Sequence, residues 1–215
     1  HLMLYLPVAA ADGKIWLNNN LGADYANFNH TNFNPAQQAT SATDYLAYGS
    51  LFQWGRKGDG HELITYTNGT TGSAVNGTTS TKSDAPTDAL FILELNYPED
   101  WRVAQDGTLW ATEASPNNPC PVGFRVPNDA ELTTLVTSSS ITNSATAASS
   151  AMKFTVPGFR YYNNGSLSQV GNFGYYWSSS SVSGGYTSGR YFHAGDTVTD
   201  SYPRAYGMSV RCLKD

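Results

Sequence analysis

Short stretches in which aromatic or β-branched residues alternate with polar ones recur along this 215-residue chain. Because successive side chains of a strand point to opposite faces of a sheet, this alternation indicates strands that are buried on one face. The length allows one large domain or two small ones. Since no internal repeat is visible, we predict a single α+β domain over residues 4–215, with few helices and a C-terminal antiparallel sheet.

One helix has clear start signals. Asn128 is a good N-cap, and Glu131 follows three residues later, as in a capping box. Leu132, Leu135 and Val136 then form an apolar stripe at helical spacing. These signals predict a helix that begins directly after Asn128.

The other elements are expected from shorter patterns. A short helix is expected over 44–48, and strands are expected near 14–17, 49–54, 153–160, 175–179, 189–194, 197–199 and 208–213. The dipeptide Asn164-Gly165 predicts a tight hairpin. Residues 65–86, rich in Thr, Gly, Asn and Ser, and residues 138–150, rich in Ser, Ala and Thr, predict exposed low-complexity loops.

The last quarter of the chain has the composition of a recognition surface. Residues 160–215 hold eight of the fourteen tyrosines, ten serines and eight glycines. Tyrosine gives large contact area at low entropic cost, while Ser and Gly adapt around it, and antibody paratopes use the same mixture. Alternation places Tyr191 and His193 on one face of a strand and Arg190 and Phe192 on the other. Packing in an aromatic core is the alternative, but the surrounding Ser, Gly and Asp favour exposed tyrosines.

Charge and hydropathy exclude two classes of function. The net charge is −5, and the basic residues are scattered rather than clustered, which argues against nucleic-acid binding. No apolar run approaches the roughly 18 to 20 residues that a membrane-spanning helix needs. We therefore expect neither a nucleic-acid partner nor direct membrane insertion.

The two cysteines allow two interpretations. Cys120 lies in a proline-flanked loop and Cys212 in an expected terminal strand. They are either a disulfide that closes a long loop or two unpaired buried thiols, and we favour the disulfide. A disulfide would favour an oxidising compartment, hence an extracellular or cell-surface location.

No pattern of side chains indicates an enzyme or a cofactor. No Ser/His/Asp or paired-carboxylate arrangement is apparent, and His30 and His61 lie in polar stretches without metal-ligand spacing. Asp196 and Asp200 could offer oxygens to a structural calcium, but loop aspartates are usually only solvated. We therefore predict no enzyme activity, no cofactor and no metal.

Some aromatic and basic residues are expected to have structural roles. The predicted core aromatics are Trp16, Trp54, Phe159, Tyr176, Trp177 and Phe192. Arg125, Arg160 and Arg211 are expected to bond loop carbonyls rather than to capture an anion.

Five segments, in order, resemble the motifs of one family: residues 48–56 (YGSLFQWGR), 118–127 (NPCPVGFRVP), 157–160 (PGFR), 174–180 (GYYWSSS) and 209–212 (SVRC). Together they are similar to the Fibrobacter succinogenes major paralogous domain, which is abundant on the surfaces of gut Bacteroidetes. The resemblance covers the chain from about residue 13 to the end. It implies a C-type-lectin-like fold whose terminal antiparallel sheet binds ligands on its outer face.

The C-terminal quarter also resembles the variable proteins of diversity-generating retroelements, in which this fold carries residues rewritten at adenine-rich codons. An ordinary, invariant member of the family is the alternative. With either version, the predicted ligand-binding residues are Tyr175, Tyr186, Ser188, Tyr191, His193, Asp196, Asp200, Ser201, Tyr202 and Tyr206.

These inferences lead to one expected function and two alternatives. We expect a recognition or adhesion domain that binds a protein or glycan on another cell or particle, on a bacterial surface or alternatively on a phage particle. A structural surface or pilus-tip module that binds neighbouring subunits is the first alternative. An oxidase like the formylglycine-generating enzymes, which share the lectin-like fold, is remote because only Cys212 lies where that chemistry needs two close cysteines.

Overall fold

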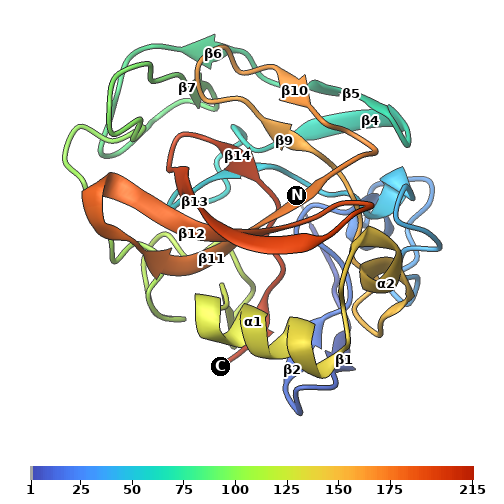
Figure 1. Ribbon diagram of the computed structural model, residues 1–215. Helices are drawn as coiled ribbons and strands as arrows, with labels where there is room; N and C mark the ends of the chain where they lie inside the picture. Colours follow the sequence, from blue (N-terminus) through green and yellow to red (C-terminus); the bar gives the residue numbers. More distant parts are fainter. Residues whose placement is uncertain (1) are drawn as a thin grey trace.

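The computed structural model describes residues 2–215 and has a mixed α+β fold, with short and mostly antiparallel sheets (Figure 1). The helices are α1 (Asp129–Ser138) and α2 (Ser144–Ser149), with 3₁₀ turns η1 (Asp24–Ala26), η2 (Tyr45–Ala47) and η3 (Ser183–Gly185). The strands are β1 (Pro7–Ala9), β2 (Ile15–Leu17), β3 (Phe52–Gln53), β4 (Ile64–Asn68), β5 (Thr71–Ala74), β6 (Thr78–Thr79), β7 (Phe91–Ile92), β8 (Phe124–Arg125), β9 (Phe159–Arg160), β10 (Leu167–Ser168), β11 (Gly174–Ser181), β12 (Tyr186–Phe192), β13 (Thr197–Pro203), β14 (Gly207–Met208) and β15 (Leu213–Lys214).

The longest strands form one antiparallel sheet near the carboxyl end, in the order β11-β12-β13. Two four-stranded sheets have the orders β1-β2-β15-β8 and β10-β9-β14-β3. Figure 1 shows α1 on one side of the β11-β12-β13 sheet and strands β9, β10 and β14 on the other. The expected C-terminal antiparallel sheet is therefore present, whereas a C-type-lectin-like identity remains a prediction.

The predicted helix is confirmed as α1. The Asn128 side chain accepts a hydrogen bond from the Glu131 backbone N–H at 2.9 Å, and the Glu131 carboxylate accepts one from the Asn128 N–H at 2.9 Å. This reciprocal capping box satisfies two backbone donors that a helix otherwise leaves unpaired. Leu132, Leu135 and Val136 are buried, so the apolar stripe faces the core.

The hairpin signal at Asn164-Gly165 is also confirmed, since β9 and β10 pair on either side of it. Two expected loops are wrong. Residues 65–86 contain most of the β4–β5 hairpin and strand β6, which pairs with β7 in parallel. Residues 138–150 contain α2, where Asn143 and Thr146 form a second capping box. Both segments are stabilised by backbone pairing or capping, which need no large apolar side chain. Their polar composition therefore did not indicate these elements.

The core consists of two apolar clusters that meet at β11. Trp177 belongs to one, with Trp54, Trp101 and Trp110, while its neighbour Tyr176 belongs to the other, with Trp16 and the apolar side of α1. Adjacent residues of a strand point to opposite faces, so β11 contributes to both clusters. All six predicted core aromatics are buried.

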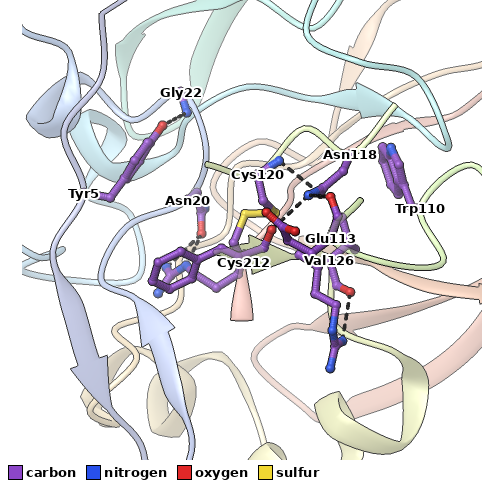
Figure 2. Close-up of a disulfide and its surroundings, with 12 residues drawn as sticks. Tyr5, Asn20, Gly22, Trp110, Glu113, Asn118, Cys120, Val126 and Cys212 are labelled. Carbon is purple, nitrogen blue, oxygen red and sulfur yellow. Dashed lines mark hydrogen bonds between the residues drawn. A yellow bond between two sulfur atoms is a disulfide. The ribbon is translucent and has the colours of Figure 1, made fainter. Parts of the chain in front are cut away.

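The predicted disulfide is confirmed between Cys120 and Cys212, at a sequence separation of 92 (Figure 2). Cys212 is fully buried in the core. Asn118 holds the Cys120 loop, since its side chain accepts a bond from the Cys120 N–H at 3.2 Å and donates one to the Phe124 carbonyl at 2.9 Å. The bridge thus connects the proline-flanked loop to the last strands of the chain.

The predicted role of the three motif arginines is confirmed for two of them. Arg160 donates to the carbonyls of Gly165, His61 and Asn76, and Arg211 donates to the carbonyl of Met152 at 2.7 Å and to the Asn20 side chain. Arg125 differs from the prediction, because its short contacts go to the carboxylates of Glu131 and Asp215 and its only carbonyl contact, with Val126, is 3.5 Å long.

Within residues 2–215, no helix is both long enough and apolar enough to cross a membrane.

Candidate functional site: an aromatic face on the C-terminal sheet

Strand register gives the β11-β12-β13 sheet two different faces. Tyr175 lies opposite Tyr191, and Thr187 lies opposite Tyr202. Because alternate residues share a face, these three tyrosines point to the side that carries β9 and β14. Phe192 and Arg190 point to the other side, toward α1, where the Arg190 guanidinium donates to the Thr133 hydroxyl at 3.1 Å. The predicted alternation around Tyr191 is therefore confirmed.

Half-buried aromatic side chains gather on the side away from α1. We define the aromatic face by eight of them: Tyr161, Tyr162, Phe173, Tyr175, Tyr191, His193, Tyr202 and Tyr206. Each contacts at least two others of the set, with ring centroids 4.6 to 6.2 Å apart. Tyr175, Tyr191 and Tyr202 come from the β11-β12-β13 sheet, and the other five rings come from loops. Their contacts join them into one cluster. They are neither fully exposed nor sunk in the core.

Tyr202 shows how the surface is anchored to the interior. Its ring contacts the buried Trp177 ring at 6.2 Å and the Tyr175 ring at 5.7 Å, both edge to face. A side-chain carbon placed on Gly189 would lie 3.1 Å from the Tyr202 ring, so the missing side chain lets this ring lie close against the sheet. Edge-to-face contacts of this kind are each worth about 1 kcal/mol beyond the area they bury.

The phenols of the aromatic face are neutral hydrogen-bonding groups. Burial and the nearby Tyr191 and Asp200 raise the pKa of Tyr175 to about 12. Burial, Asp196 and Asp200 also raise the pKa of Tyr191, and burial raises that of Tyr202 above its usual range. Each hydroxyl therefore keeps its proton at neutral pH and can both donate and accept a hydrogen bond.

The structure brings seven of the ten predicted ligand-binding residues to this face or its rim. Tyr175, Tyr191, His193, Tyr202 and Tyr206 belong to the face, and Asp196 and Asp200 are exposed beside it. Strand register places Asp200 on the same side of the sheet as Tyr175, Tyr191 and Tyr202, and its charge contributes to the raised pKa values of these tyrosines.

The remaining three predicted residues lie elsewhere. Ser188 is only 6% exposed and donates to Asp129 of α1 at 3.0 Å, and Ser201 lies opposite it in β13, so both are on the α1 side of the sheet. Tyr186 contacts the Tyr97 ring, and its hydroxyl donates to the Glu99 carboxylate at 3.1 Å. Ser188 and Tyr191 are three residues apart in one strand, so strand alternation already predicts that they face opposite sides.

Three members of the aromatic face were missed by sequence reasoning: Tyr161, Tyr162 and Phe173. Tyr161 and Tyr162 stand just before the Asn164-Gly165 turn, and Phe173 stands just before β11. Their aromatic character was visible, but their position depends on how the β9–β10 hairpin packs beside β11. That arrangement is non-local.

A buried polar group around His61 is the other unexpected site. His61 is fully buried, contrary to its expected place in a polar loop. Its Nδ1 lies 2.7 Å from the Asp59 carboxylate, and its Nε2 accepts a hydrogen bond from the Gln53 N–H at 2.9 Å. The His61 Nδ1 therefore carries the proton that Asp59 accepts.

Asp59, His61 and Glu62 are also close enough together to be metal ligands. Both ring nitrogens of His61 already have hydrogen-bond partners, however, and Arg56 donates to the Asp59 carboxylate at 2.7 Å. This arrangement fits a hydrogen-bonded support for the loop after β3 better than a metal centre.

A pocket of about 660 Å³ lies apart from the aromatic face and shares no lining residue with it. Two of its polar groups already have partners within the protein. The Tyr5 hydroxyl accepts from the Gly22 N–H at 2.8 Å (Figure 2), and the Glu62 carboxylate accepts from the Gly60 N–H at 2.9 Å. The aromatic face, with its contacting rings and exposed carboxylates, is the stronger candidate.

Comparison with family models, with curated proteins and with solved structures found no match for this chain. The family resemblance of its motifs therefore stays a prediction.

Proposed function

We propose that this protein is a recognition domain that binds another macromolecule through the aromatic face. The observation that supports this most directly is the half-exposure of eight contacting rings on one side of a sheet whose other side is packed on α1. Contiguous aromatic surface of this kind is characteristic of binding sites, in which a few anchors supply most of the affinity.

The proposed mechanism is aromatic anchoring with polar adaptation. Tyr191, which is half-buried, offers part of its ring and a neutral hydroxyl. Beside it, Asp196 and Asp200 are exposed and can accept hydrogen bonds from a ligand. Desolvated rings would supply affinity and the polar rim would supply orientation.

The motif resemblance and the disulfide support a cell-surface setting for this function. We propose a C-type-lectin-like domain of the Fibrobacter succinogenes major paralogous type, and its diversified, retroelement-linked version is consistent with tyrosines and aspartates at the aromatic face. The Cys120–Cys212 bridge is compatible with an oxidising, extracellular location.

Replacing the Tyr191 ring of the aromatic face tests the proposal. The labelled wild-type protein would be screened against a glycan array and against intact bacterial cells, and each ligand found would be titrated with Tyr191→Ala and Phe28→Ala. Phe28 is a matched control, because it is 58% exposed and lies outside the aromatic face. We expect Tyr191→Ala to weaken binding by about 2 kcal/mol, roughly thirtyfold.

Thermal melts complete this test. Tyr191 is half-buried and is not packed on either core cluster, so its loss should change the melting temperature little. Tyr202 packs on Trp177 and is unsuitable for separating binding from stability. Ligands that bind Tyr191→Ala as tightly as the wild type would refute the proposal. A large fall in its melting temperature would show that the ring is structural.

One observation favours a structural surface module as a second candidate. Leu95, Tyr97 and Val103 are about 70% exposed within one short segment, an apolar patch that neighbouring subunits could cover. Concentration-dependent association of the purified protein in sedimentation, abolished by Leu95→Ser/Val103→Ser but unaffected by Tyr191→Ala, would support this alternative.

A further inference from the structure

The charged groups around the aromatic face are unbalanced. Asp196 and Asp200 are exposed beside it. Glu99 accepts a hydrogen bond from the Tyr186 hydroxyl at 3.1 Å, and its charge contributes to the raised pKa of Tyr162. Among residues 2–215, no lysine or arginine nitrogen lies within 4.0 Å of these three carboxylates. Lys82, which pairs with Glu94 at 3.0 Å, is already engaged.

Arginines of the same part of the chain do not reach this surface. Arg160, Arg190, Arg204 and Arg211 are between 1% and 8% exposed, and each is engaged in internal contacts. Arg204, for example, pairs with the buried Asp100 at 3.0 Å and stacks over the Trp54 ring. The protein therefore contributes negative charge to the aromatic face, while these four arginines are buried.

His193 does not neutralise Asp196. Its Nδ1 lies 3.2 Å from the Asp196 carboxylate, but this nitrogen already accepts hydrogen bonds from the backbone N–H groups of Gly195 and Asp196. A ring nitrogen that accepts two N–H groups carries no proton, so the contact is not an ion pair. In the part of the chain that the structure describes, the carboxylate of Asp196 therefore has no positively charged partner.

Aromatic rings and carboxylates attract the same kind of group. The face of a tyrosine ring is electronegative and binds ammonium or guanidinium groups, most strongly where water is partly excluded. In the sheet, Asp200 lies opposite Gly189. Along β13 it stands between Val198 and Tyr202 on the side that bears Tyr175 and Tyr191. An arginine or lysine brought to this place would contact rings and a carboxylate at once.

Resting on the proposed function, we infer that the partner of the aromatic face is a protein that presents a basic segment, whose arginine or lysine side chains lie against the tyrosines between Asp196 and Asp200. Charge complementarity favours this occupant over a neutral glycan. A neutral sugar could stack on the rings but would leave these carboxylates without a counter-charge.

Two short synthetic peptides provide the test. The probe is a flexible decapeptide in which arginine alternates with glycine and serine, and its control is the same peptide with citrulline, which keeps the shape but lacks the charge. Titration calorimetry of the wild-type protein should show binding of the arginine peptide and at least about tenfold weaker binding of the citrulline peptide.

Three variants locate the interaction. Asp196→Asn/Asp200→Asn should weaken binding of the arginine peptide about tenfold, and Tyr191→Ala should weaken it further. Asp88→Asn is the matched control, because Asp88 is exposed, contacts none of the eight rings and accepts only a local N–H, as asparagine also can. Asp88→Asn removes one negative charge and the double variant removes two. A loss in Asp88→Asn that is half of the double variant's loss on a logarithmic scale would therefore reveal mere net-charge attraction and overturn the inference.

The outcomes separate this inference from the function on which it rests. If the arginine peptide fails to bind, or binds no better than the citrulline peptide, the basic partner is refuted. If a neutral glycan binds the wild type and not Tyr191→Ala, the recognition function survives while the basic partner is refuted. If every probe binds Tyr191→Ala as well as the wild type, both are refuted.

Discussion

His61 is a side chain whose charge is set by its surroundings. Burial lowers its pKa to about 4 from an ordinary value near 6.5, although its hydrogen bond to Asp59 works in the opposite direction. The folded protein therefore holds a neutral ring at pH values where the unfolded chain already binds a proton.

This difference makes stability depend on pH. Between about pH 4 and 6.5 the unfolded state binds the additional proton, so the free energy of unfolding rises with pH, by up to about 1.4 kcal/mol per pH unit from this group. Urea denaturation at several pH values in this window should show the rise, with a flatter profile for His61→Gln. Because Glu62, whose pKa is raised by burial, also titrates, the comparison between the two proteins is the relevant measurement. Parallel profiles would contradict the assignment.

Single residues were predictable where their roles are local. Asn128 and Glu131 predict a helix start, because the capping box that they form lies within four residues. His61 was not predictable as a buried residue, since its partner Gln53 and its covering ring Phe91 come from separate strands. Exposure of the tyrosines was expected in outline, but half-burial depends on Trp177 and Gly189 beneath them.

At the scale of elements, the disulfide joins the loop before β8 to the strands at the carboxyl end. It closes a loop of 92 residues, and on the chain-entropy account a loop of this length stabilises the folded state by roughly 4 to 5 kcal/mol. Cys120→Ala/Cys212→Ala should lower the free energy of unfolding by about this amount in urea titrations. The wild type in reducing agent serves as the companion measurement. A loss below 1 kcal/mol in both would show that the bridge is dispensable.

Elements with strong local signals were predicted, and those stabilised by distant partners were not. The β9–β10 hairpin and α1 follow from a turn dipeptide and a cap. The β6–β7 pair is parallel and begins where Thr78 pairs with Phe91, with twelve residues between them. The polar sequence of this segment does not indicate that pairing. Residues 144–149, rich in Ala and Ser, form a short helix that depends on Asn143 and on contacts of Ala147 with the core.

For the whole molecule, the position of β11 predicts how the protein unfolds. Tyr176 and Trp177, adjacent in this strand, belong to the two different apolar clusters, so neither cluster can open without disturbing the other. We expect one cooperative transition, with coincident midpoints when tryptophan fluorescence and far-ultraviolet circular dichroism are followed during thermal unfolding. Two separated midpoints would show that residues 4–215 comprise two independently folding units.

The same strand has a consequence for binding. Tyr175 projects from a strand whose next two residues, Tyr176 and Trp177, are packed into the core on opposite sides of the sheet. Its conformational freedom was therefore largely removed when the chain folded, and a ligand need not remove it again. Less of the binding free energy would then be lost to ordering this side chain, so even a small partner could bind there.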